Sequence, residues 1–133
     1  IVTVTSVNEL ARDGNDTVRW NRLHPTDAPR VPYLTAQLSK STGPFIAVTD
    51  YQKAYTDQIR EFVPGRFTVL GTDGFGRSDT RRQLRRHFEV SREHIVLATL
   101  TALVEEGELD VNIVELAMSD LEINTDKPNP MRL

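Results

Sequence analysis

The stretch Phe67–Arg81 reads FTVLGTDGFGRSDTR and joins an apolar run to a basic segment through three glycines. The run Phe67–Leu70 is short, apolar and rich in β-forming residues, which predicts a buried strand. Ser78 or Asp79 can cap a helix that continues through Phe88. A strand, a glycine-rich turn and a helix are the repeating unit of α/β folds, so this stretch predicts that class.

The remaining sequence extends the same alternation in both directions. At the N-terminal end we expect a strand over Ile1–Thr5, a helix from the Ser6 cap to Gly14, an irregular segment over 15–32 and a helix over Tyr33–Leu38. A strand over Pro44–Thr49 and a helix capped by Asp50 and ended by Pro64 and Gly65 should then precede the strand and helix already described. After these we expect a helix opened by Ser91 and closed at Gly107, and a last helix capped by Asp110. Such alternation predicts one α/β domain over residues 1–133, a three-layer, mostly parallel sheet with helices on both faces.

Three strands make a thin sheet, and the first of them begins at Ile1. One explanation is a trimmed, disordered start. The other is that a further strand and helix of the same domain precede this sequence, and we expect the second.

Composition excludes several classes of site. The chain has no cysteine, so disulfides, thiolate metal sites and cysteine nucleophiles are absent from it. No apolar run approaches the roughly 20 residues that span a bilayer. The apolar start Ile1–Thr5 is short and has no basic n-region, so we do not expect it to be a signal peptide. Six arginines face three acids between Arg77 and Glu93, whereas Glu105 to Asp126 carries eight acids and no lysine or arginine. This asymmetry favours ion pairing within the protein or across a protein interface over nucleic-acid binding.

The glycine spacing G-x-x-G-x-G is neither a dinucleotide fingerprint nor a P-loop. A structural strand-to-helix turn is the simpler interpretation, and an anion site is the alternative. The pair Asp73-Gly74 is similar to the Gly-Asp-Gly that begins the thiamine-diphosphate and magnesium motif. That motif also needs an Asn pair some two dozen residues later, but no Asn occurs between Phe75 and Val111, and Thr72 replaces the first glycine. We therefore expect no metal site here.

The whole string from Gly71 to Arg81, followed by LRRHFEV over 84–90, resembles the C-terminal domain of the homodimeric pyruvate dehydrogenase decarboxylase subunit. The resemblance extends to VTS at 4–6, NELARDG at 8–14, RWNRLHP at 19–25, Gly43-Pro44 and the ending NTDKPNP at 124–130. It covers essentially the whole chain.

This resemblance implies a transketolase-like third domain of a much longer bacterial, cytoplasmic enzyme that oxidises the pyruvate of glycolysis. In that family the first two domains bind thiamine diphosphate and magnesium, and the acetyl unit passes to a lipoyl group on dihydrolipoyl acetyltransferase. The third domain completes the dimer. The resemblance implies no catalytic, cofactor-binding or metal-binding residue in this chain. The chain alone should therefore be inactive. Its partners would be the rest of its subunit, a second copy and the acetyltransferase, with no nucleic acid and no membrane. A free-standing α/β module that binds an anion or a protein is the alternative.

The candidate interface or anion-contacting residues lie in the loop and at the start of the following helix. They are Asp73, Gly74, Phe75, Gly76, Arg77, Ser78, Asp79, Arg81 and Arg82. Arg81 with Arg85 and Arg82 with Arg86 stand four apart on a helix, where like charges repel, so something should compensate them. Four interpretations remain open: a solvated face, pairing with Glu89, Glu93 or the acidic C-terminal helices, a protein interface, and an anion held at the helix start with Arg77. The three histidines show no metal-ligand spacing, and no G-x-S-x-G elbow supports a hydrolase.

Overall fold

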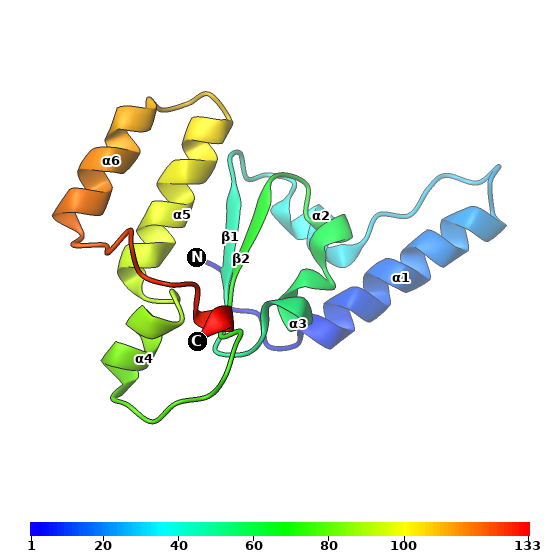
Figure 1. Cartoon of the computed structure of the whole chain (residues 1–133). Helices are drawn as coiled ribbons and strands as arrows, with labels where there is room; N and C mark the ends of the chain where they lie inside the picture. The colour runs from blue at the N-terminus through cyan, green and yellow to red at the C-terminus, as the bar shows by residue number, and fades with distance from the viewer.

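A computed structural model describes all 133 residues (Figure 1). The elements are α1 (Val7–Leu23), α2 (Tyr33–Leu38), β1 (Phe45–Val48), α3 (Lys53–Asp57), the 3-10 helix η1 (Arg60–Phe62), β2 (Phe67–Leu70), α4 (Arg81–His87), α5 (Arg92–Glu105), α6 (Val111–Asp120) and the 3-10 helix η2 (Pro130–Arg132).

The two strands form a parallel sheet in which Phe45 lies opposite Phe67 and Val48 opposite Leu70. Helix α5 packs on both strands and α3 contacts β2. In Figure 1, α5 and α6 lie on one side of the strands and α1 to α3 on the other. The α/β class and both of these strands are confirmed, as is the helix over Tyr33–Leu38.

The strand predicted over Ile1–Thr5 is wrong. These residues are exposed and join no ladder, so the sheet has two strands instead of three. A β-branched pattern gives a strand only where a neighbouring strand takes up its backbone hydrogen bonds, and no segment of this chain does so.

Helix α1 begins as predicted, since the Ser6 hydroxyl accepts a hydrogen bond from the Glu9 amide at 3.3 Å. It does not end at Gly14 but runs on to Leu23, so residues 15–23 are helical and not irregular. Gly14 is a packing glycine, because a Cβ there would lie only 2.3 Å from the Phe62 ring. The resulting contact outweighs the weak helix propensity of glycine.

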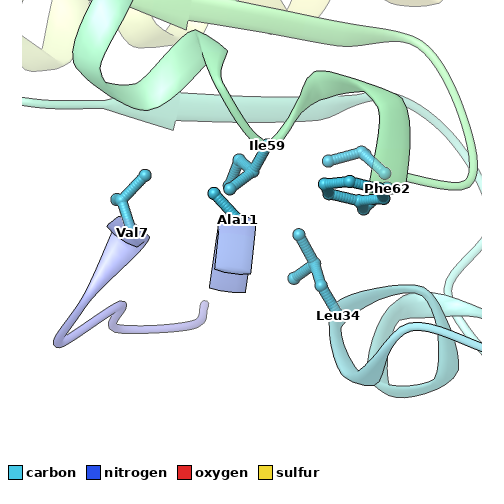
Figure 2. Close-up of a cluster of buried hydrophobic side chains, with 6 residues drawn as sticks. Val7, Ala11, Leu34, Ile59 and Phe62 are labelled. Carbon is cyan, nitrogen blue, oxygen red and sulfur yellow. The ribbon is translucent and has the colours of Figure 1, made fainter. Parts of the chain in front are cut away.

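The core lies on this side of the molecule (Figure 2). Val7 and Ala11 of α1 face Leu34 of α2 and the segment that carries Ile59 and Phe62. Phe62 is only 3% exposed. Burial of one face of α1, one residue of α2 and the turn before β2 holds the N-terminal half together.

The helix predicted after β1 is broken into α3 and η1, and Asp50 does not cap it. Gln52 occupies the N-cap position of α3 without a side-chain hydrogen bond. The hydrogen-bond acceptor that caps α3 comes instead from the glycine-rich loop. A local sequence pattern could not show this contact.

The C-terminal helices follow the prediction closely. Ser91 precedes α5, Gly107 follows it with φ +78°, and the Asp110 carboxylate accepts a hydrogen bond from the Asn112 amide at the start of α6. Glu122 ends α6 with φ +51°, the left-handed conformation that glycine usually supplies. None of the helices combines the length and apolar composition that a membrane span requires.

Candidate interaction site

The first half of the glycine-rich loop is bound to the segment after β1. The Thr72 amide donates to the Tyr51 carbonyl at 2.9 Å, and a Cβ on Gly71 would lie 2.7 Å from that same oxygen. The Asp73 carboxylate accepts from the Lys53 amide at 3.1 Å, with the Lys53 ammonium 3.9 Å away. Asp73 therefore caps α3 from a distance, and its carboxylate is already used.

Gly74 serves a second close approach. Its φ is +110°, and a Cβ there would lie 2.6 Å from the carbonyl oxygen of Pro130. The C-terminal segment thus packs directly against the loop backbone, which only glycine permits.

The second half of the loop is free of such contacts. Phe75 is 78% exposed. A Cβ on Gly76 would meet no atom within 4 Å, and its φ lies outside the left-handed region. Ser78 is also exposed and forms no side-chain hydrogen bond. The loop therefore divides into a half that the chain itself uses and an open half, Phe75 to Ser78, in which only the Arg77 side chain forms polar contacts within the chain.

Helix α4 begins one or two residues later than predicted, because Thr80 is its cap and not Ser78 or Asp79. The Thr80 hydroxyl accepts from the Gln83 amide at 3.3 Å. Asp79 accepts from the Thr80 amide at 2.8 Å and lies 3.6 Å from the Arg77 guanidinium. Asp79 thereby fixes the bend that leads into the helix.

The arginines of α4 are almost unpaired. Neither Arg81 nor Arg82 forms an ion pair. Arg85 has one distant partner, the Asp50 carboxylate at 3.9 Å. Pairing of these side chains with the acidic C-terminal helices, one of the open alternatives, is wrong. Among the arginines outside α5 and α6, only Arg66, which precedes β2, pairs with one of these helices, at 2.7 Å from Glu105.

The end of α4 depends on Lys127, which sequence reasoning missed. Its ammonium donates to the carbonyls of Arg86 at 3.2 Å and His87 at 2.6 Å, and to the Glu89 carboxylate at 3.0 Å. Glu89 itself has φ +61°. Because Lys127 is about forty residues away in the chain, no local spacing signals this cap.

A polar hollow of about 310 Å³ lies between the Arg77–His87 pair and the end of α6. Arg77 donates to His87 Nδ1 at 3.2 Å, and since a guanidinium cannot accept, this nitrogen carries no proton. Burial lowers the pKa of His87, and the Arg77 and Lys127 cations lower it further. Burial also lowers the pKa of His94. Hydrogen bonds from Ser91 and Arg92 lower the pKa of Glu93 to about 2. The histidines are thus held neutral beside cations, which suits a structural role.

A second hollow, of about 430 Å³, lies between the open half of the loop and α4, and we call it the loop–α4 hollow. Its apolar lining comes from Leu84, Phe88 and Val90, and Gly76 also lines it. Arg77, Arg81 and Arg85 add cationic groups to the lining. Of the predicted site residues, the structure brings Gly74, Gly76, Arg77 and Arg81 together here, but it places Asp73 in a cap and Arg82 outside this hollow.

The residues do not fit the thiamine-diphosphate and magnesium motif that Asp73-Gly74 resembles in sequence. Asp73 is committed to the start of α3, and no three histidine, aspartate or glutamate side chains gather closely enough to hold a metal ion.

Residues 1–91 match the family described as the transketolase-like TK C-terminal domain. The chain belongs to this family. It is 51% identical over 126 residues to the pyruvate dehydrogenase E1 component of Cupriavidus necator, and 48% identical over 131 residues to the protein of that name from Escherichia coli K12. The Haemophilus influenzae protein of that name is 48% identical over 132 residues. These alignments cover 95 to 98% of the chain but only 14 to 15% of the relatives' own length. The predicted resemblance is confirmed.

Proposed function

We propose that this transketolase-like domain is the C-terminal domain of a pyruvate dehydrogenase decarboxylase subunit and serves dimer architecture and assembly contacts. The observation that carries the proposal is the 48 to 51% identity to pyruvate dehydrogenase E1 components over nearly the whole chain. Because the chain spans about one seventh of their length, most of the enzyme would lie in other domains.

The chemistry of the intact enzyme would belong to those other domains. The subunit would decarboxylate pyruvate and pass the acetyl unit to the lipoyl group of dihydrolipoyl acetyltransferase, in the bacterial cytoplasm. Thiamine diphosphate would carry the covalent chemistry, as cofactors generally do. Asp73, the one residue whose sequence context suggests a metal ligand, is bound to Lys53 instead.

The contact role is supported by surfaces that the chain leaves unsatisfied. Phe75 is exposed, Arg81 and Arg82 lack ion partners, and α6 exposes Val111 and Leu116 at 62% and 63%. Exposed aromatic and arginine side chains are the types enriched at protein interfaces.

The test uses the full-length subunit with Arg81→Glu and Arg82→Glu combined. We expect weaker dimerisation or weaker binding of the acetyltransferase, measured by analytical ultracentrifugation and calorimetry. Pyruvate decarboxylation per folded active site should stay near the wild-type rate, because no catalytic group changes. Unchanged dimerisation together with unchanged acetyltransferase binding would refute the contact role.

A second test addresses the missing chemistry. The purified 133-residue chain should bind no thiamine diphosphate and decarboxylate no pyruvate. A saturable calorimetric titration with the cofactor and magnesium would contradict this expectation. The gene-level sequence before Ile1 separates the proposal from the free-standing module, since only a decarboxylase would carry a Gly-Asp-Gly and Asn-pair motif there.

A further inference from the structure

We infer that the loop–α4 hollow seats a segment from the rest of the same subunit, one that inserts an apolar side chain beside a carboxylate. This inference rests on the proposed function, since it requires a subunit longer than the chain described.

The first argument is a glycine that the chain does not need. Gly71 and Gly74 each lie so close to another backbone that a Cβ would overlap it, at 2.7 and 2.6 Å. Gly76 has no such neighbour and no left-handed φ. Where the backbone conformation suits other residues, glycine lowers stability because it gives the unfolded chain more conformational freedom, so a glycine at position 76 calls for an explanation. Gly76 lines the hollow, and a side chain at this position would narrow the space that an incoming segment needs.

The second argument is an uncompensated charge. Arg81 forms no ion pair and stands four residues before Arg85 on α4, a spacing at which like charges repel. The carboxylate nearest to Arg85, that of Asp50, is 3.9 Å away and exposed. A carboxylate from the occupant would lie between two guanidinium groups and relieve this repulsion.

The third argument is the apolar lining. Leu84 and Phe88 are half-buried and so offer a surface to an apolar side chain, whereas Val90, also in the lining, is only 5% exposed. Phe75 stands exposed on the same loop, next to the lining residue Gly76. Arginine and aromatic side chains around an apolar centre are typical of sites that carry most of an interface's binding energy.

The structure also favours the rest of the subunit as the occupant. The chain spans only 14 to 15% of the relatives' length, so most of the expected subunit lies outside it. The hollow is preformed, because Gly74 is fixed by Pro130 and the end of α4 by Lys127. A preformed seat loses little conformational entropy when another domain packs on it.

The experiment compares two single cysteines in the full-length subunit. Ser78→Cys places a thiol on the open half of the loop without adding a side chain to the hollow, since Ser78 is exposed and lies outside its lining. Thr26→Cys is the matched control, since Thr26 is exposed and belongs to no surface proposed as a contact. Maleimide labelling of each site is followed by peptide mass spectrometry, first in the native subunit and then in urea.

We expect native labelling at position 78 to be at least tenfold slower than at 26, with the difference lost in urea. Adding Arg81→Glu should restore fast labelling at 78. Equal native rates would show an open hollow and overturn the inference. Protection that disappears when the dimer is diluted to monomers, or after exhaustive dialysis, would assign the seat to a partner copy or a soluble ligand, and either result also overturns it.

Should Ser78→Cys fail to fold, hydrogen exchange of the unsubstituted subunit decides the same question. Amides of residues 75–78 should exchange at least tenfold more slowly than those of the exposed Thr26 and Ala28, which form no hydrogen bond within the chain, and equal rates would overturn the inference. The pyruvate decarboxylation assay of the wild-type subunit is independent of these readouts. A subunit that is active but has an open hollow therefore refutes this inference alone, whereas an inactive subunit refutes the proposed function.

Discussion

The two halves of the molecule bury their apolar residues very differently. The N-terminal half forms a cluster in which Ile59 and Phe62 are 4% and 3% exposed. Helices α5 and α6 are richer in apolar residues than α1, yet Ala102 is the only residue of these two helices that is buried. A helix that is apolar on all faces is normally covered on several sides. The N-terminal half therefore has a core of its own, whereas most apolar side chains of α5 and α6 stay partly exposed in this chain.

The largest test of this contrast removes one aromatic side chain from the core. Phe62→Ala should destabilise the chain by about 3–5 kcal/mol, because it leaves a cavity beneath α1. The matched change Leu116→Ala, on exposed α6, should stay within about 0.5 kcal/mol. Urea unfolding followed by circular dichroism measures both. Similar losses at the two positions would remove the distinction between the halves.

A second substitution tests how tightly the core is packed. Gly14→Ala should cost about 1–3 kcal/mol through overlap with Phe62, even though alanine favours helix. If the overlap is the cause, Phe62→Leu should make the same substitution less costly, as a double-mutant cycle of urea midpoints will show. A stabilised single variant would mean that Gly14 is not a packing glycine.

The C-terminal half allows a change in the opposite direction. Glu122→Gly should stabilise the chain by about 0.5–1 kcal/mol, because Glu122 holds a left-handed φ that glycine adopts freely. Gly107→Ala, at φ +78°, is the control and should destabilise it by about 1 kcal/mol. Thermal unfolding distinguishes the two. A loss of stability on Glu122→Gly would show that its side chain matters more than its backbone.

The smallest expected effect concerns acid. The pKa of Glu93 is about 2 in the folded chain against an ordinary value near 4.5. The carboxylate therefore stabilises the fold above its unfolded pKa, and that contribution disappears as the pH falls from about 4.5 towards 2. Glu93→Gln should make the free energy of unfolding vary less with pH between about 4.5 and 2. The slope of that free energy against pH should stay unchanged between pH 7 and 8. An unchanged acid profile would contradict the proposed role of the Ser91 and Arg92 hydrogen bonds.

These halves also differ in how far sequence predicts them. Ser91, Gly107 and Asp110 mark helix ends by local chemistry, and the helices between them were predicted correctly. Gly14 was misread as a helix end because its reason is Phe62, far along the chain. The strand over Ile1–Thr5 was misread because a strand depends on its neighbour.

The parts of the candidate site also differ in how far sequence predicts them. The glycine-rich loop and the like-charge repulsion on α4 can be recognised from sequence, since both depend on local spacing. That Arg81 has no ion partner could not, because the sequence left internal pairing open. The cap that Asp73 gives to Lys53, and the one that Lys127 gives to α4, depend on contacts between residues twenty and about forty positions apart. Sequence could therefore show which loop matters but not which of its residues the fold already uses.

The contacts of Lys127 and Pro130 have a consequence for synthesis on the ribosome. Both residues are translated after the loop and the helix that they hold. While Lys127 and Pro130 are still in the exit tunnel, α4 lacks its C-terminal cap and Gly74 lacks its neighbour. The glycine-rich loop can therefore reach its final shape only after residues 127–130 have left the ribosome, so it matures later than its own position in the chain suggests.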